Sequence, residues 1–254
     1  MSFNPSSYVA SNKLETANSA LLTAHIIAGT VSLALFWMPV LSRKGGINHR
    51  RYGKAYVKLM SVVVITAAVM SILNLLIGDI VRAIFLGFLA LLTAKPLWLG
   101  IAVLGTKKQM SAAYRRNSII LNGLLSLCGF ALIVYGITLL GQDVAFLMLA
   151  FGALGLLGVP ELFVLLRNQP SCVPSSSEQG SNGKPSKTGK PWLAGHIRDM
   201  IISGIAAYTA FLAFGASALM GGLFTGALVM VPWLAPTVVG SLGIFYATTR
   251  YTRA

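Results

Sequence analysis

The chain has 254 residues, of which 56% are apolar and only 10% are charged, and its mean hydropathy is +0.75. Because soluble proteins carry about a quarter charged residues, this composition excludes an ordinary soluble domain and indicates an integral membrane protein. A net charge of +14 would suggest nucleic-acid binding in a soluble chain. No aromatic-interleaved basic fold accompanies the charge, so we expect no nucleic-acid partner.

The chain begins with a polar segment, residues 1–19, which lacks a basic stretch and therefore predicts an N-terminal tail rather than a signal peptide. Seven apolar segments follow, each near the roughly 20 residues that a membrane-spanning helix needs. Their apolar character is continuous, whereas strands of a membrane barrel alternate. The sequence predicts an all-α, polytopic bundle of seven transmembrane helices near residues 20–41, 56–77, 83–104, 118–140, 144–166, 197–221 and 225–248.

A hydrophilic stretch, residues 167–191, separates the fifth predicted helix from the sixth. It is rich in Ser, Pro, Gly and Lys, which predicts a flexible cytoplasmic linker. The linker divides the chain into a five-helix membrane segment, residues 20–166, and a two-helix segment with a short basic tail, residues 192–254.

The basic residues gather in alternate connecting segments. Seventeen of the twenty follow the first or third predicted helix, separate the fifth from the sixth, or end the chain. The opposite side has Lys13 and Arg82, balanced by Glu15, Asp79 and Asp143. The positive-inside rule therefore predicts the N-terminus outside and the C-terminus inside the cell. The basic segments should contact the anionic headgroups of membrane lipids.

Two of the three histidines lie on the predicted inner side. His49 and His196, together with Glu161, could ligate a transition metal, and the two histidines alone could ligate a heme iron. The spacing matches no HExxH or CxxC motif. The alternative interpretation is that these histidines only bond to lipid headgroups and helix ends.

The third histidine, His25, lies near the outer end of the first predicted helix, about 24 Å by helical rise from Leu41. Asn74 and Tyr135 lie at a similar predicted depth. Three interpretations stay open: a small polar cavity open to the outside, an outer heme ligand at His25, or a simple interhelical hydrogen bond.

Two charged residues lie deep in the predicted helices, each beside a proline. Lys95 precedes Pro96, and Glu161 follows Pro160. Each proline frees a backbone carbonyl, and broken hydrogen bonding beside an intramembrane charge recurs at transport sites. We therefore predict that Lys95 and Glu161 approach each other and that they form a transport site.

Four stretches, AHIIAGTVSL (24–33), HRRYGKAY (49–56), HIRDMIISGIAAYTAF (196–211) and PWLAPTVVG (232–240), resemble an uncharacterised family of predicted bacterial multi-pass membrane proteins, a domain of unknown function. The resemblance implies a bacterial inner-membrane location and supplies no reaction. The positions that match the family pattern are His25, Gly29, His49, Arg50, Gly53, Tyr56, His196 and Trp233. The arrangement of histidines among membrane helices is also similar to that of small b-type membrane cytochromes, which hold heme through paired histidines. This chain departs from the form of that pattern that binds two hemes, because its three histidines cannot ligate two hemes in the usual bis-histidine way.

Three functions remain open at this point. The first is a redox membrane protein that binds heme b or a transition metal through His49 and His196, with a redox partner. The second is a small proton-coupled transporter built around Lys95 and Glu161. The third is a structural or assembly protein without a cofactor.

Overall fold

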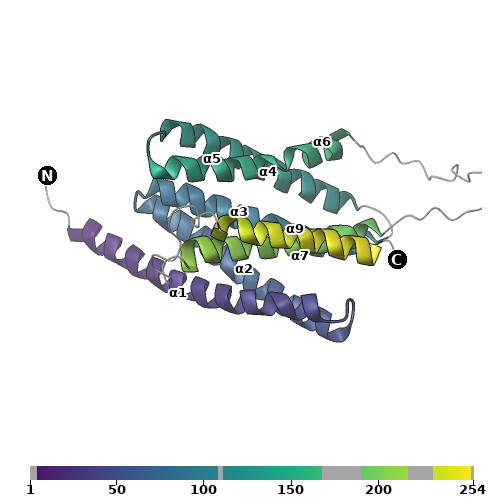
Figure 1. Cartoon of the computed structure of the whole chain (residues 1–254). Helices are drawn as coiled ribbons and strands as arrows, with labels where there is room; N and C mark the ends of the chain where they lie inside the picture. The colour runs from purple at the N-terminus through teal and green to yellow at the C-terminus, as the bar shows by residue number, and fades with distance from the viewer. Residues whose placement is uncertain (1–4, 108–110, 168–189, 217–230, 253–254) are drawn as a thin grey trace, which may run out of the picture.

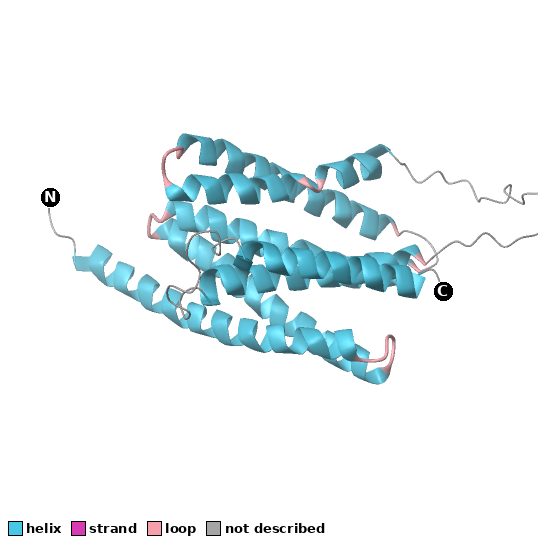
Figure 2. Cartoon of the chain, in the orientation of Figure 1, coloured by secondary structure: helices cyan, strands magenta, loops and turns pink. Residues whose placement is uncertain are grey.

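The computed structural model of the chain describes residues 5–107, 111–167, 190–216 and 231–252. Every regular element in these ranges is helical (Figures 1 and 2). Seven helices or helix pairs are long and apolar enough to cross a membrane, which confirms the predicted all-α, seven-helix membrane fold. The elements are α1 (Pro5–Leu41), α2 (Ile47–Leu76), α3 (Ile80–Ala102), η1 (Val103–Thr106), α4 (Ala112–Thr138), α5 (Asp143–Leu156), α6 (Val159–Arg167), α7 (Pro191–Ala210), η2 (Phe211–Ala216) and α9 (Val231–Thr252).

The observed helices extend past several predicted segments. Helix α1 begins at Pro5 and so includes most of the predicted polar tail, and α2, α4 and α7 begin earlier than predicted. Hydropathy marks only the part of a helix inside the hydrocarbon core, whereas the backbone stays helical into the headgroup layer. The predicted linker and the segment between the sixth and seventh predicted helices lie mostly outside the described residues.

The fifth predicted span is two helices rather than one. Helix α5 ends at Leu156 and α6 begins at Val159, with Pro160 at the second position of α6. Proline has no backbone N–H, so the carbonyl of Leu156 loses its helical donor at this point. The candidate span Val144–Arg167 is therefore interrupted within its length.

Most helices that follow one another in the chain pack as antiparallel neighbours. Helix α1 contacts α2, α2 contacts α3, and α4 contacts both α5 and α6, while α3 also contacts α4 and α7, and α7 contacts α9 (Figure 1). Three tight turns contain glycines with positive φ, namely Gly45 at 74°, Gly78 at 87° and Gly141 at 96°. This backbone conformation costs glycine little, so the turns can be short.

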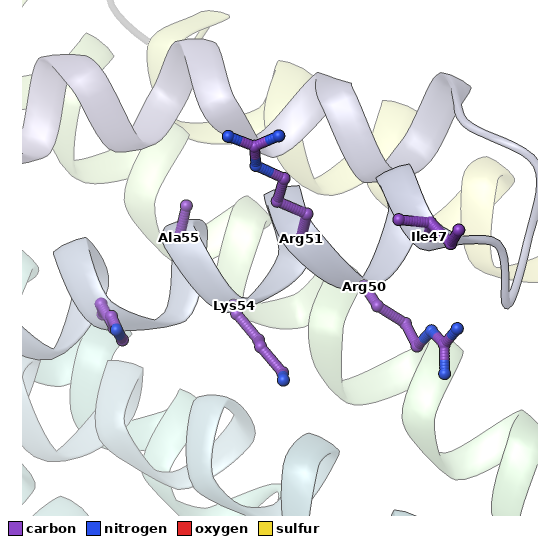
Figure 3. Close-up of a pocket in the computed structure, with 6 residues that line it drawn as sticks. Ile47, Arg50, Arg51, Lys54 and Ala55 are labelled. Carbon is purple, nitrogen blue, oxygen red and sulfur yellow. The ribbon is translucent and has the colours of Figure 1, made fainter.

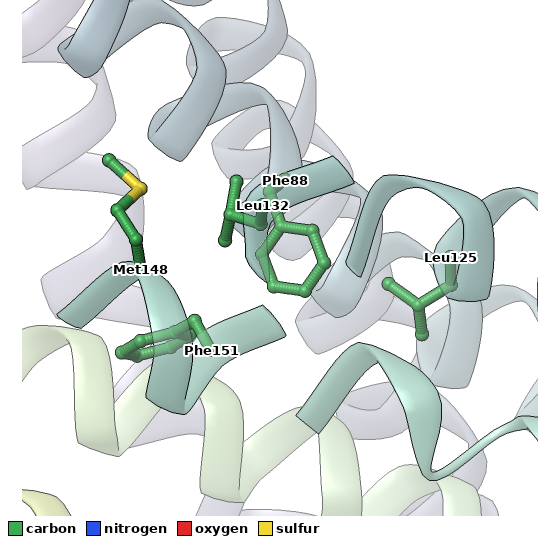
Figure 4. Packing of buried hydrophobic residues seen from close by; sticks show 5 residues of the cluster. All are labelled: Phe88, Leu125, Leu132, Met148 and Phe151. Atoms are coloured by element: carbon green, nitrogen blue, oxygen red, sulfur yellow. The ribbon is translucent and has the colours of Figure 1, made fainter. Parts of the chain in front are cut away.

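The main core lies between α3, α4 and α5. Phe88 of α3 packs with residues of α4 and α5, and the cluster comprises Phe88, Leu125, Leu132, Met148 and Phe151 (Figure 4). Glycines let α4 and α5 approach closely, because a Cβ on Gly129 would lie 2.7 Å from the carbonyl oxygen of Gly152. Small residues at helix contacts are typical of membrane bundles.

The outside of the bundle is apolar and one of its ends is basic. Ile26, Phe130 and Phe245 are 55%, 58% and 69% exposed, as expected for side chains that face lipid. The α1–α2 loop, the end of α6 and the C-terminus lie at one end of the bundle (Figure 1). We call this the cationic end. Its cytoplasmic location remains a prediction from the positive-inside rule.

Candidate functional site

Lys95 and Glu161 approach each other inside the bundle, as the sequence predicts. The Lys95 Nζ lies 4.0 Å from Glu161 Oε2, and the two side chains are 16% and 35% exposed. Glu161 Oε1 also lies 3.7 Å from an Nη atom of Arg198. Arg198 in turn donates from Nε to Asp199 Oδ1 at 2.8 Å. Lys95, Glu161, Arg198 and Asp199 therefore form one charged cluster contributed by α3, α6 and α7.

The charged cluster lies at the break between α5 and α6. A Cβ built on Gly158, in the break, would lie 3.5 Å from the Lys95 ammonium, and Glu161 stands in the first turn of α6. A helix C-terminus carries partial negative charge and an N-terminus partial positive charge. The end of α5 thus favours the lysine, and the start of α6 favours the glutamate.

Asn122 of α4 faces the same break. Its side chain is fully buried, and its Nδ2 donates to the carbonyl of Ser118 at 2.9 Å. Its Oδ1 has no hydrogen-bond partner among the described residues, and it would lie 2.7 Å from a Cβ on Gly158. Asp199 Oδ2 is likewise buried without a partner in the described ranges. Glycine at 158 therefore leaves room where the unsatisfied Asn122 Oδ1 and the Lys95 ammonium lie.

His49 and His196 come together at the cationic end. Their ring centroids are 6.4 Å apart, with an angle of 69° between the rings. The Nδ1 of His49 bonds to the carbonyl of Pro39 at 3.0 Å, and the Nδ1 of His196 bonds to the carbonyl of Gly100 at 2.6 Å. With a proton on each Nδ1, both Nε2 atoms are free acceptors, which is the usual orientation of ligating histidines.

The predicted three-ligand metal set is not supported. Among the residues that the structure describes, no group of three or more His, Cys, Asp and Glu side chains is placed to hold a metal ion. The physical reason is the placement of Glu161, whose carboxylate faces Lys95 and Arg198. His49 and His196 are left as a pair.

The predicted outer group is not joined by hydrogen bonds in the described chain. His25 Nδ1 lies 3.1 Å from the Val63 carbonyl oxygen and 3.0 Å from Thr66 Oγ1. Asn74 instead donates to Met70 of its own helix at 2.7 Å. Tyr135 belongs to α4, which packs against α3, α5 and α6. His25 therefore ties α1 to α2, well away from the cationic end.

Sequence reasoning did not select Arg198, Asn122 or Gly158. Asn122 had a signal, because an amide within an apolar span usually faces the bundle interior. In the sequence, Arg198 is only one of the seventeen basic residues that predict the cytoplasmic side. Gly158 matters because residues of neighbouring helices lie against it, and the sequence does not specify which helices are neighbours.

Comparison of the chain with protein-family models, with curated proteins and with solved structures found no match. The charged cluster and the histidine pair are therefore the features that indicate a function, and the family resemblance remains a prediction.

Proposed function

We propose that this multi-pass membrane protein is a proton-coupled carrier of a small anionic solute in a bacterial inner membrane. The observation behind the proposal is the pairing of Lys95 with Glu161 at the break between α5 and α6. Discontinuous helices with charges at their broken ends recur at the binding sites of secondary transporters. Intramembrane charges are costly, which favours a functional role for them.

The coupling follows from charge conservation in a medium of low dielectric constant. Glu161 stands between two cations, 4.0 Å from Lys95 and 3.7 Å from Arg198, and the four charges of the cluster sum to zero. A proton that binds Glu161 converts its carboxylate to a neutral acid and releases Lys95 from its partner. An anionic group of the solute then pairs with the Lys95 ammonium, which restores neutrality. Loss of the proton returns Glu161 to Lys95 and expels the anion.

The test is anion-driven proton uptake into proteoliposomes that contain a trapped pH-sensitive dye. Succinate, citrate, glutamate and inorganic phosphate are each added outside. One of them should acidify the lumen. If the transported species is a monovalent anion, its cotransport with one proton is electroneutral, and an imposed potassium potential should leave the rate unchanged. Failure of all four anions to acidify the lumen of wild-type vesicles contradicts the proposal.

Three variants connect the flux to the site. Glu161→Gln removes the proton acceptor, Lys95→Met removes the anion partner, and Gly158→Ala places a methyl 2.7 Å from Asn122 Oδ1. Each should abolish the flux. Gly123→Ala is the matched control, since its methyl would approach nothing closer than Leu162 at 4.0 Å. A Glu161→Gln protein as fast as wild type contradicts the coupling step.

A heme- or metal-binding redox role is the second candidate, and the juxtaposed histidine pair favours it. His49 and His196 would supply two Nε2 ligands, and a bound heme b or transition metal would supply one-electron transfer. The purified protein should then show a Soret band or stoichiometric metal, lost in His49→Ala and in His196→Ala. A colourless, metal-free preparation removes this candidate. A structural or assembly role gains if neither set of variants changes any activity.

A further inference from the structure

The start of α2 presents a row of basic side chains. Arg50, Arg51, Lys54 and Lys58, with Ile47 and Ala55, line a shallow depression of about 500 Å³ (Figure 3). Arg50, Lys54 and Lys58 stand four residues apart, which places these three along one side of the helix. Arg50 and Lys54 extend to one side of the α2 ribbon and Arg51 to the other (Figure 3). We call these four residues the α2 cationic face.

Several other cations at this end, unlike the α2 cationic face, have partners within the protein. Lys44 donates to the Pro39 carbonyl at 3.2 Å, and Arg115 donates to the Leu165 carbonyl at 2.7 Å. Lys107 lies over the ring of Trp192 at 5.0 Å. In the described ranges, the four residues of the α2 cationic face make no side-chain hydrogen bond or ion pair. No acidic residue lines the depression. Four positive charges are thus left to an external partner.

The depth of the α2 cationic face indicates the kind of partner. Helix α2 has 30 residues, or about 45 Å of rise, which exceeds a hydrocarbon core of roughly 30 Å. The residues after Lys58 are long enough to span that core, so the first three turns lie at the level of the lipid headgroups. Ile47 is 76% exposed at the edge of the depression, where it can contact acyl or glycerol carbons.

We infer that the α2 cationic face is a binding site for the phosphate headgroup of an anionic phospholipid. Two guanidinium groups can each donate two parallel hydrogen bonds to phosphate oxygens, and the two lysines add point charges. Each cation near an anionic membrane surface should contribute about fivefold in affinity. The site is independent of the carrier proposal, since none of its residues belongs to the charged cluster or the histidine pair.

The test is lipid binding to the purified full-length protein, measured by native mass spectrometry with phosphatidylglycerol and phosphatidylcholine at equal concentration. Wild-type protein should retain phosphatidylglycerol preferentially. The variant Arg50→Ala/Arg51→Ala/Lys54→Ala/Lys58→Ala should lose at least tenfold of that preference. The matched control, Arg43→Ala/Arg116→Ala/Arg167→Ala/Lys190→Ala, removes the same charge from exposed positions outside the depression and should keep it. An equal loss in both variants overturns the inference in favour of diffuse attraction.

Two further measurements cover the remaining outcomes. Because removal of four cations can disturb insertion, Arg50→Lys/Arg51→Lys retains the charge and loses only the paired donors. It should weaken phosphatidylglycerol binding several-fold, and unchanged binding in this variant refutes phosphate recognition by the arginines. Inorganic phosphate is added in a separate arm and should not displace the lipid at millimolar concentration. Displacement there, with no preference between the two lipids, assigns the face to a soluble phosphate compound and overturns the lipid site.

Discussion

The charged cluster makes a non-additive prediction for stability. Glu161→Gln removes the carboxylate shared by Lys95 and Arg198, and leaves the lysine, whose side chain is 16% exposed, without its anionic partner. Lys95→Met removes the lysine and leaves Glu161 with Arg198. The first change should therefore destabilise the protein more than the second. The double variant, which leaves no buried lysine unpaired, should be more stable than Glu161→Gln alone.

The magnitude follows from the distances and the exposure of the side chains. Unit charges 4 Å apart interact by about 4 kcal/mol at an effective dielectric constant of about 20. Arg198 and Glu161 are 44% and 35% exposed, so water screens their 3.7 Å pair to about 1 kcal/mol or less. The unpaired lysine dominates, and insertion scales give about 2.5 to 3.5 kcal/mol for a lysine at mid-membrane. We expect Glu161→Gln to cost about 2 kcal/mol, with a coupling of at least about 1 kcal/mol between the two sites.

The assay is unfolding of the purified protein in mixed micelles by titration with dodecyl sulfate, for the wild type, both single variants and the double variant. The coupling energy is the departure of the double variant from the sum of the single effects. If the two effects add within about 0.5 kcal/mol, the residues do not interact and the reasoning from their 4.0 Å separation is refuted.

Three other predictions follow from particular contacts. Gly129→Ala would place a methyl 2.9 Å from the Cα of Gly155, so the same titration should show a loss of about 1 to 3 kcal/mol from overpacking. Tyr56→Phe removes a buried 2.9 Å hydrogen bond to Ser203 and should cost only about 0.6 kcal/mol, since membrane hydrogen bonds average that amount. In whole cells, a membrane-impermeant maleimide should label Ser7→Cys and spare the native Cys172, if the N-terminus is outside.

Each of these predictions has its own control or contrary outcome. Gly123→Ala lies on the same helix as Gly129 and should leave the titration midpoint unchanged, because its methyl meets only ordinary contacts. A Tyr56→Phe loss above about 2 kcal/mol would mean that more than one hydrogen bond depends on the hydroxyl. The labelling is carried out with Cys128 replaced by serine, and reaction of Cys172 in intact cells would reverse the proposed orientation.

The sequence was sufficient to predict seven helices and the approach of Lys95 to Glu161. Continuous apolar segments specify the spans. The helical rise per residue then gives the distance of both residues from the same basic end of the bundle. An unpaired charge in lipid is costly, so two opposite charges inside the spans, each beside a proline, are expected to meet. The sequence did not specify which helices are neighbours around the bundle, so Arg198 and Asn122 could not be assigned to the same site.

The partner of His25 could not be predicted because the start of the second helix is placed too late by hydropathy. A second span from residue 56 puts Asn74 about 27 Å from its inner end, level with His25. Helix α2 instead begins at Ile47, so Thr66 is the residue that lies opposite His25. Asn74 lies about 12 Å farther along α2 by helical rise. A basic segment that is helical from Ile47 therefore moves Asn74 away from His25 and separates the predicted outer group.

Gly100 connects the histidine pair to the charged cluster. Its carbonyl accepts from His196, and a Cβ at this position would lie 3.1 Å from the Cβ of Asp199. The two α7 residues are three positions apart and share the face that packs on α3, so glycine at 100 lets both approach. A bulkier residue there would disturb both candidate sites at once and could not distinguish a carrier from a redox protein. Lys95 belongs only to the charged cluster and His49 only to the histidine pair, so variants of those two residues separate the functions.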